Sequence, residues 1–457
     1  MRTEKDLIGE LQIDENVYWG IHTQRAIFNF KVSSIQVSKR LIHAIVLVKK
    51  ACLLTNFYYS FIEEKTFKAL ELAIDEILDG NFDDQFPVDA FQGGAGTSTN
   101  MNVNEVIANR ANEILGFRKG EYAVVNPLEH VNLHQSTNDV YPTALKIACI
   151  YGFRELSKKI ADLQNVFQKK EKEFAHIVKI GRTELQEAVP ITMGAEFSAF
   201  AEAFSRDRWR IFKCEERLRT VNIGGTAVGT GLSAPQEYIF LVIEKLREVT
   251  NLGISRADNL MGETSNVDPF VEVSGILKTH ASNLIKISND LRLMNMIDEI
   301  RLPQVQAGSS IMPGKVNPVI PEMIMQIGLK VISNDFLITE AASRGSLEIN
   351  EFMPLLAHSI LETIDLLINA DDILEDYTSK IIANEDLCMK YFECSPTLIT
   401  AFIPYIGYEK ATEIIREFSD DEEISLRKFL ENKLGKEIVE KVLSPFKLTA
   451  LGYRRDD

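Results

Sequence analysis

The sequence predicts a mostly α-helical protein built around a bundle of long helices. Apolar residues recur at steps of three and four along residues 142–176 and 270–293, which is the spacing of one helix face. Two further long helices are expected at 318–340 and 348–374. Helices of this length exceed the globular mean of about 11–12 residues, so a long bundle is the natural architecture.

The first of these helices shows the pattern most clearly. Its apolar face comprises Leu145, Cys149, Phe153, Leu156, Ile160, Leu163 and Phe167. Pro142 and Pro318 lie where two of the helices are expected to begin, and proline is tolerated there because a first-turn N–H has no helical partner. Signals for β-strands are few, and short extended pieces are expected at 179–183 and 220–223.

The chain has 457 residues, which is too long for one compact core. Shorter helices precede the bundle and a more highly charged stretch of short helices follows it. We therefore expect a mainly helical N-terminal domain at 1–138, a central long-helix domain at 139–384 and a small helical C-terminal domain at 385–457. Hydrophobic residues make up 45% and charged residues 25% of the chain, as in ordinary globular proteins.

The net charge of −16 limits the partners. An acidic surface argues against nucleic acid, because phosphate contacts need clustered Lys and Arg, although a few cations in a pocket can still bind an anionic substrate.

The charged N-terminus does not resemble a signal peptide. The longest apolar stretch near it, 42–54, is interrupted by His43, Lys49 and Lys50, so no run approaches the ~20 apolar residues of a membrane span. No membrane contact and a cytoplasmic location are expected.

Neither the cysteines nor the histidines predict a metal site. The five cysteines are scattered and form no CxxC pair, which favours reduced, buried thiols. The only close histidine pair is His130 and His134, which could bind zinc from one helix face, but no HExxH pattern is present. Ordinary surface or interface histidines are expected, with no metal.

Four polar loops interrupt the helical rhythm with small and hydroxyl residues, at 93–100, 135–139, 181–186 and 308–318. Taken singly, each is more simply a turn or a helix N-cap, where Gly, Ser, Thr and Asn are common.

The fourth loop has further features of an anion-binding segment. Gly308 and Gly314 permit unusual backbone angles, and Lys315 and Asn317 supply a cation and an amide just before a helix. A flexible loop with exposed backbone N–H groups and a cation suits a carboxylate or a phosphate. It is not a nucleotide-binding P-loop, because Val316 rather than Ser or Thr follows the lysine.

Together, the four loops resemble the aspartase/fumarase superfamily, and the resemblance spans nearly the whole chain. Residues 308–318 are similar to its signature loop, and residues 97–100 and 135–139 are similar to two further blocks. The resemblance implies a mostly α, three-domain fold with a long central helical bundle. It also implies a homotetramer in which these bundles form a twenty-helix core and each active site takes residues from three subunits.

Within the superfamily, the closest similarity is to the aspartate ammonia-lyases, through residues 18–26, 302–308, 319–322 and 404–409 and through Thr137. This implies a reversible anti-elimination of ammonia from L-aspartate, which gives fumarate through an aci-carboxylate intermediate. The implied substrate is a small dicarboxylate, and no cofactor is expected. Two alternatives stay open: fumarate hydratase of class II, and a catalytically silent homologue that keeps the oligomer.

The resemblance also implies roles for single residues. Ser309 is expected to be the general base, with its oxyanion stabilised by loop amides and by Lys315. The α-carboxylate is expected to contact Lys315, Thr183 and Asn317, the β-carboxylate Thr97, Ser136, Thr137 and Ser310, and the amino group or its carboxylate neighbour Asn138. Arg25 is a further candidate for the substrate site: it could bind a substrate carboxylate or simply form a surface ion pair, and its match to the block at 18–26 favours an indirect role. The loop should close over the substrate and exclude water.

Glu184 departs from the superfamily's fumarase pattern. It stands where fumarases have a histidine that works with a glutamate, and Glu322 corresponds to that glutamate here. Losing the histidine argues against a hydratase, which must assist a hydroxide leaving group. A carboxylate at 184 could bind a substrate ammonium, or repel a carboxylate unless it shares a proton with Glu322. Glu184 is thus a further candidate for substrate binding. The stretch 293–301 is also shorter than is usual in the superfamily.

Overall fold

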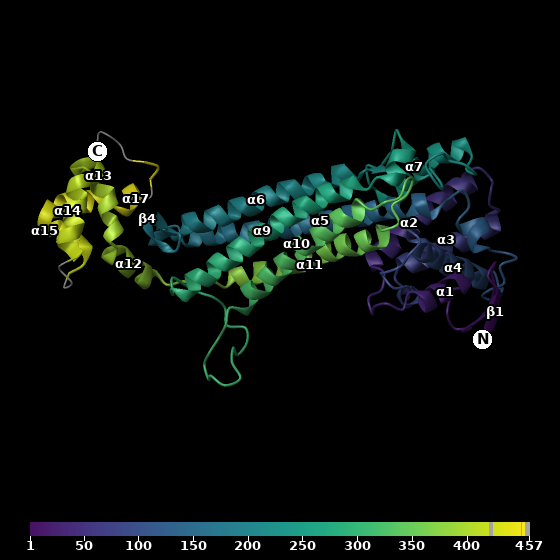
Figure 1. Cartoon of the computed structure of the whole chain (residues 1–457), viewed down its shortest axis with the longest axis horizontal. Helices are drawn as coiled ribbons and strands as arrows, with labels where there is room; N and C mark the ends of the chain where they lie inside the picture. The colour runs from purple at the N-terminus through teal and green to yellow at the C-terminus, as the bar shows by residue number, and fades with distance from the viewer. Residues whose placement is uncertain (420–423, 449, 453–457) are drawn as a thin grey trace. The chain divides into compact units, whose positions relative to one another are not determined.

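The computed structural model describes residues 1–419, 424–448 and 450–452, and it is mostly helical, as predicted (Figure 1). Its five long helices are α5 (Thr137–Glu173), α6 (Met193–Leu218), α9 (Asp268–Met296), α10 (Val319–Ala342) and α11 (Met353–Ser379). The chain forms two compact units. Unit 1 comprises residues 1–157, 209–281 and 329–368, and unit 2 comprises 158–208, 282–328 and 369–457, so all five long helices supply residues to each.

The four long helices predicted from the apolar pattern are all present, and two of the predicted starts differ. Helix α5 begins five residues before Pro142, which lies inside it. Pro142 cannot donate to the carbonyl of Asn138 one turn earlier, and the side-chain amide of Asn222 donates to that oxygen instead, at 3.0 Å. Helix α11 begins at Met353 rather than at 348. In the turn just before it, the side-chain oxygen of Asn350 accepts the N–H of Phe352 at 2.9 Å.

Unit 1 also contains shorter helices and strands. They are β1 (Arg2–Lys5), β2 (Glu10–Ile13), α1 (Ile21–Asn29), α2 (Lys39–Tyr58), α3 (Glu64–Leu78), α4 (Thr97–Ile114), β5 (Thr220–Val221), α7 (Gln236–Thr250), β6 (Ser255–Arg256) and α8 (Leu260–Ser265), with a 3₁₀ turn at Asp83–Gln85 and a π turn at Pro127–Val131. Strands β1 and β2 pair antiparallel, and β5 pairs parallel with β6. The β5 strand confirms part of the predicted extended piece at 220–223.

Helix α2 forms much of the core of unit 1. Among the described helices, it is the one with the length and apolar composition to cross a membrane. The sequence pattern did not predict an apolar run of this length. Most of that stretch is buried inside the protein, including Ile45, Val46 and Val48, which are fully buried.

Polar side chains join the long helices within unit 1. Ser274 and Lys278 of α9 contact the carboxylate of Asp335 on α10 at 2.8 and 2.5 Å. The amide of Asn334 on α10 donates to Thr363 on α11 at 3.0 Å. These contacts set the axial positions of α9, α10 and α11 within the unit, because each buried polar group needs its partner.

Unit 2 contains a β-hairpin and the C-terminal helices. Its shorter elements are β3 (Val178–Thr183), β4 (Gln186–Thr192), β7 (Ile300–Arg301), β8 (Ile382–Ala383), α12 (Glu385–Cys394), α13 (Ile403–Ile406), α14 (Tyr408–Ser419), α15 (Leu426–Leu434), α16 (Lys436–Val442) and α17 (Pro445–Leu448), with a 3₁₀ segment at Pro396–Phe402. Strand β3 confirms the extended piece predicted at 179–183. Its Val178 and Ile180 share one hydrophobic core with Phe392, Leu398 and Phe402.

The cysteines are free, as predicted, and four of the five are buried. Cys394 is the exception: it is exposed at the end of α12. The division into domains at 138 and 384 stays a prediction, since the two compact units follow a different partition of the chain.

Candidate active site

The predicted site residues fall into two groups, one in each unit. Arg25, Thr97, Ser136, Thr137 and Asn138 belong to unit 1. Thr183, Glu184, Ser309, Ser310, Lys315 and Asn317 belong to unit 2. Each group is described within its own unit.

Thr97 is the first residue of α4 and its side chain is exposed. The turn before it places Gly94, Ala95 and Gly96 at positive φ angles of 83°, 53° and 90°. A Cβ added to Gly96 would lie 2.3 Å from the ring of Tyr141, so only glycine fits between this ring and the helix. The turn therefore presents the Thr97 hydroxyl at a helix N-terminus, where backbone N–H groups favour an anion.

The change Gly96→Ala is expected to destabilise the protein by roughly 2–4 kcal/mol, because a left-handed backbone and overpacking against Tyr141 act together. The matched control is Gly116→Ala, where φ is also left-handed, at 85°, but the added Cβ meets nothing within 4 Å. Urea unfolding of both variants measures the difference. Equal losses for the two would show that Tyr141 does not confine Gly96.

Ser136 and Asp139 cap the N-terminus of α5 reciprocally. The Oγ of Ser136 accepts the N–H of Asn138 at 3.2 Å, and Asp139 Oδ1 accepts the N–H of Ser136 at 2.9 Å. The second carboxylate oxygen of Asp139 accepts the N–H groups of Gly224 and Thr226 at 3.1 and 2.9 Å. Burial raises the pKa of Asp139 to about 6. This buried carboxylate fixes the loop that carries Ser136, Thr137 and Asn138.

Asparagine side chains tie the start of α4 to the start of α5. The amide of Asn100 donates to Thr137 Oγ1 and to Asn132 Oδ1, both at 3.1 Å. Asn104, one turn along α4, donates to the same Asn132 oxygen at 3.1 Å. Two helix N-termini and their hydroxyls, Thr97 and Thr137, are thereby held by one network inside unit 1.

Lys49 lies beneath this network and is fully buried on α2. Its Nζ donates to Asn132 Oδ1 and Gln135 Oε1, both at 2.9 Å. Burial lowers the pKa of Lys49 to about 7. Neither Lys49 nor Asp139 is among the predicted site residues, although a lysine inside the apolar run 42–54 and an aspartate three residues after Ser136 are signals in the sequence.

The pKa of Lys49 predicts a change of stability with pH. Because the folded pKa lies below the ordinary 10.5, the unfolded chain binds more protons between pH 7 and 10.5, so stability rises with pH across that window. Between pH 7 and pH 9, the wild type is expected to gain roughly 2 kcal/mol of unfolding free energy relative to Lys49→Met. Urea unfolding of both proteins at the two pH values tests this. Parallel pH profiles would contradict a lowered pKa of the buried Lys49.

Asn138 and Arg25 are already engaged. The Asn138 side-chain nitrogen donates to the carbonyl of Ala227 at 2.8 Å, and its Oδ1 can only accept a hydrogen bond. Arg25 forms a bidentate pair with Asp6 at 2.7 and 2.8 Å and lowers the pKa of that carboxyl to about 2. Arg25 therefore anchors the β1–β2 turn, and it forms an ion pair rather than standing free for a substrate.

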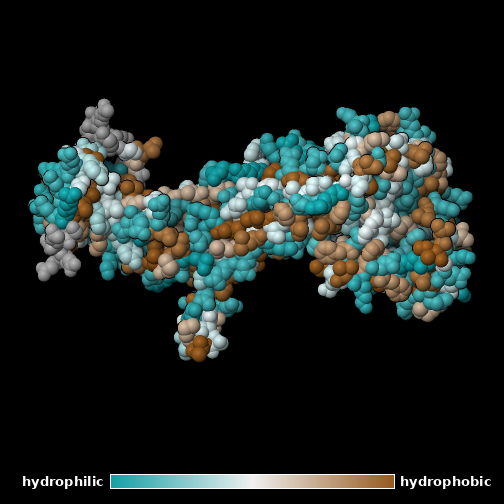
Figure 2. Space-filling view, in the orientation of Figure 1, coloured by the Kyte–Doolittle hydropathy of each residue, from teal (hydrophilic) through white to brown (hydrophobic). Residues whose placement is uncertain are grey.

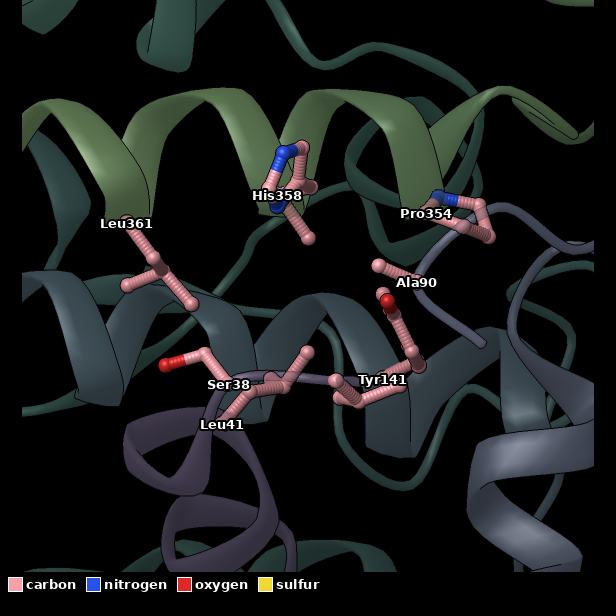
Figure 3. Close-up of a pocket in the computed structure, with 9 residues that line it drawn as sticks. Ser38, Leu41, Ala90, Tyr141, Pro354, His358 and Leu361 are labelled. Carbon is pink, nitrogen blue, oxygen red and sulfur yellow. The ribbon is translucent and has the colours of Figure 1, made fainter. Parts of the chain in front are cut away.

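A small cavity near this region is not the substrate site (Figure 3). Its lining includes Ser38, Leu41, Ala90, Tyr141, Pro354, His358 and Leu361. The cavity measures about 10 Å³, which is room for about one water molecule. None of the predicted site residues lines it.

In unit 2, Thr183 ends strand β3 and Glu184 begins the turn to β4. Glu184 and Leu185 have φ angles of 51° and 64°, which is the pattern of a two-residue type I′ turn. Such turns favour Asn and Gly, so a leucine and a glutamate at these positions are strained. Thr183 and Glu184 are both exposed at the tip of the hairpin. The structure thus places both predicted residues at the exposed tip of one hairpin.

Ser309 lies in a long, largely exposed loop between β7 and α10, which extends away from the helices of its unit (Figure 1). Its Oγ accepts the backbone N–H groups of Ile311 and Met312 at 3.2 and 2.8 Å. Donors of this kind stabilise an oxygen that becomes negatively charged. The expected contact between the Ser309 oxygen and the loop amides is therefore present.

The neck of this loop is closed by three residues. The N–H of Gly308 donates to the Lys315 carbonyl at 2.7 Å, and the Asn317 amide donates to the Gly308 carbonyl at 2.8 Å. A Cβ on Gly308 would lie 2.8 Å from the backbone of Lys315 and of Asn317, so glycine is required there. Lys315 and Asn317 are thereby held next to the residue that precedes Ser309, and the Lys315 side chain is exposed.

The far end of the loop is apolar and exposed (Figure 2). Ile311 is 84% and Met312 is 49% exposed, and Ser310 is also exposed. Apolar side chains in water at the end of an extended loop are typical of a segment that is covered when it closes over a ligand or docks on a partner.

Glu322, the counterpart of the fumarase glutamate, forms a long ion pair with Arg292. Its Oε1 lies 3.7 Å from Arg292 Nη2 across a cavity of about 350 Å³ between α9 and α10. Asn289, Asn295 and Pro318 also line this cavity, which is next to the end of the Ser309 loop.

The two groups offer hydroxyls, amides, one exposed lysine and helix N-termini, all of which can bind carboxylates. No group of three or more His, Cys, Asp or Glu side chains suited to a metal ion occurs in the described residues. His130 and His134 lie in a π turn and after it, and they form separate hydrogen bonds. The chemistry that fits is acid–base work on a small anion.

Comparison with known proteins agrees with these features. A family model described as lyase matches residues 9–333. An aspartate ammonia-lyase from Bacillus subtilis is 44% identical over 458 aligned residues, covering 99% of this chain and 96% of the relative.

Two solved structures are similar over almost the whole chain. A fumarate lyase:delta crystallin from Brucella melitensis, bound to cobalt, has a TM-score of 0.95 at 41% identity and covers 98% of this chain and 100% of that one. A class II fumarase from Schistosoma mansoni has a TM-score of 0.92 at 31% identity, covering 98% of each chain. With the polar loops and long helices described above, these matches place the chain in the aspartase/fumarase superfamily of lyases, to which it belongs.

Proposed function

We propose that the protein is an aspartate ammonia-lyase, which converts L-aspartate to fumarate and ammonia. The observation that carries this is the Ser309 loop, in which two backbone amides donate to the Ser309 oxygen and the neck holds Lys315 and Asn317 beside it. The Bacillus subtilis relative, which is 44% identical over nearly the full length, is an aspartate ammonia-lyase.

In the proposed reaction, Ser309 in its oxyanion form takes a proton from C3 of L-aspartate. The electron pair left on C3 delocalises into the neighbouring β-carboxylate as an aci-carboxylate. It then forms the C2–C3 double bond as the C2–N bond breaks. The nitrogen leaves with its bonding pair as neutral ammonia, because the substrate ammonium already carries the third proton. Catalysis therefore depends on donors placed where charge develops on the carboxylate.

The hydroxyls of Thr97, Ser136, Thr137 and Ser310 are proposed to surround that β-carboxylate. The first three lie at the starts of α4 and α5, where helix N–H groups add to the hydroxyls. Thr183, Lys315 and Asn317 are proposed to bind the α-carboxylate. Asn138 is proposed to contact the ammonium, since its amide nitrogen already donates to Ala227.

Glu184 supports ammonia rather than water as the leaving group. A carboxylate exposed at the hairpin tip attracts the substrate ammonium but cannot act as the histidine acid that a hydratase uses. The test is fumarate formation, followed by ultraviolet absorbance, from L-aspartate and from L-malate in parallel. We expect turnover of L-aspartate and at most trace turnover of L-malate. Turnover of malate alone would replace the proposal with fumarate hydratase, and turnover of neither would favour a silent homologue.

We further propose a homotetramer in which each active site is shared between subunits. Large aromatic and aliphatic side chains are exposed on the long helices: Trp209 and Phe212 on α6 and Leu329 and Phe336 on α10 are each more than 60% exposed. Figure 2 shows hydrophobic patches along the long helices. Surfaces of this kind mark contacts with another chain.

The expected location is the cytoplasm, and the three-domain division at 138 and 384 is part of the same proposal.

Shared sites predict complementation between two inactive variants. Ser309→Ala alters the unit 2 group and Thr137→Val alters the unit 1 group. Refolding an equal mixture should restore roughly a quarter of wild-type activity, because about one site in four then combines the intact Ser309 of a Thr137→Val subunit with the intact Thr137 of a Ser309→Ala subunit. If mixed tetramers form and no activity returns, the site is not shared between subunits.

A further inference from the structure

A fully buried carboxylate lies at the base of the Ser309 loop. Glu299 is 0% exposed and lies in the tight turn between α9 and β7, and its N–H donates to the carbonyl of Met294 at 3.0 Å. Strand β7, Ile300–Arg301, follows at once and leads into the loop. A buried carboxylate requires cationic partners, because an unpaired charge is costly to bury.

Both cations come from strand β3 of the hairpin. Lys179 Nζ lies 2.5 Å from Glu299 Oε2, and Arg182 Nη1 contacts Glu299 Oε1. Lys179 is itself 2% exposed and also contacts Glu196 at 2.6 Å. Burial alone would lower the pKa of Lys179, but the carboxylates of Glu196 and Glu299 together raise it, so the lysine stays charged. The cluster is balanced, with two cations and two anions.

Arg182 directly precedes Thr183 and the strained turn at Glu184 and Leu185. Strained backbone persists only where surrounding contacts determine it. On the β3 side that contact is the Arg182–Glu299 pair, and on the β4 side it is the hydrogen bond from Ser395 Oγ to Glu187 Oε2, at 2.7 Å. The orientation of Thr183 and Glu184 therefore depends on Glu299.

The same turn also holds the first C-terminal helix. The Glu299 carbonyl accepts the N–H of Asn384 at 2.8 Å, and the Ile297 carbonyl accepts the Tyr391 hydroxyl at 3.3 Å. The Arg182 guanidinium lies 5.7 Å from the centre of the Tyr391 ring. Residues 297–301 thus join the hairpin tip, the start of α12 and the base of the Ser309 loop.

We propose that Glu299 is a positioning residue that fixes the Thr183–Glu184 tip against the base of the Ser309 loop. This rests on the proposed substrate contact of Thr183 and the proposed role of Ser309 as base. The charge of Glu299, and not only its bulk, is required, because it orients two cations of one strand at once. Glu299 touches no substrate, and it acts through Arg182 and Thr183.

The test is a double-mutant cycle on kcat/KM for L-aspartate with the variants Glu299→Gln, Thr183→Ala and both together. Glu299→Gln keeps the shape and removes the charge. We expect it to lower kcat/KM on the order of 10- to 100-fold. We also expect Thr183→Ala to have little further effect in the Glu299→Gln background, because Thr183 is already misplaced there. A residue that only stabilises the fold would give effects that multiply.

The matched control is Asp376→Asn, which breaks an exposed ion pair with Lys380 in the same unit and should leave kcat/KM unchanged. If Glu299→Gln does not fold, Arg182→Lys replaces it, since it keeps the charge balance and loses the planar fork. Multiplying effects, or wild-type kcat/KM in a folded Glu299→Gln or Arg182→Lys enzyme, would overturn the proposal. A wild-type enzyme that does not turn over L-aspartate would instead count against the proposed function.

Discussion

Replacing Ser309 with alanine is expected to reduce kcat for fumarate formation from L-aspartate by about 10²–10⁴-fold or more. The proton on C3 is weakly acidic, and no other described group of the Ser309 loop offers an oxygen with two backbone amides aimed at it. The loss should be mainly in kcat, because the groups that bind the carboxylates remain. Steady-state kinetics on the purified oligomer measure it.

Ser379→Ala is the matched control for this variant. Ser379 is exposed at the end of α11, and its hydroxyl only donates to a backbone carbonyl of its own helix. It should retain wild-type kcat, and both variants should keep the wild-type oligomer by size-exclusion chromatography. A Ser309→Ala enzyme within tenfold of the wild type would remove Ser309 as the base.

Replacing Lys315 with methionine is expected to lower kcat/KM by roughly 10²–10³-fold, the value of a charged hydrogen bond to a carboxylate that strengthens in the transition state. Lys315 is exposed, and the Gly308 hydrogen bond holds its backbone beside Ser309. It is proposed to serve both the α-carboxylate and the Ser309 oxyanion. KM should therefore rise and kcat should fall.

The control for Lys315→Met is Lys390→Met, which removes another exposed lysine of unit 2. Its kinetics should match the wild type, since a single exposed surface charge outside the predicted site contributes little. A Lys315→Met enzyme with a raised KM but unchanged kcat would limit the lysine to substrate binding. Unchanged values of both would exclude Lys315 from the site.

The long helices were predictable because their apolar residues repeat with the helical period over many turns. The pattern placed α9 within a few residues at each end. Helix α6 shows the same steps in Phe197, Phe200 and Phe204, and so could have been predicted as well. The β1–β2 hairpin could not, because its strands have only four residues each and three of the four residues of β1 are charged.

The candidate site was predictable as a set of loops and not as a geometry. Local sequence identified Ser309 and Lys315 through the signature loop. The partners that set Glu184 at a positive φ, and those that bury Lys49 and Asp139, are far away in the sequence. The pairing of Arg25 with Asp6 likewise depends on how the β1–β2 turn folds back, which no spacing in the chain reveals.

The most direct measurement is the stoichiometry of products released from L-aspartate by the purified wild-type protein. Fumarate is followed by absorbance and ammonia by a coupled assay. The proposed elimination predicts one fumarate and one ammonia per L-aspartate consumed, and both should be lost together in Ser309→Ala. A folded, oligomeric wild-type protein that releases neither product from L-aspartate would contradict it.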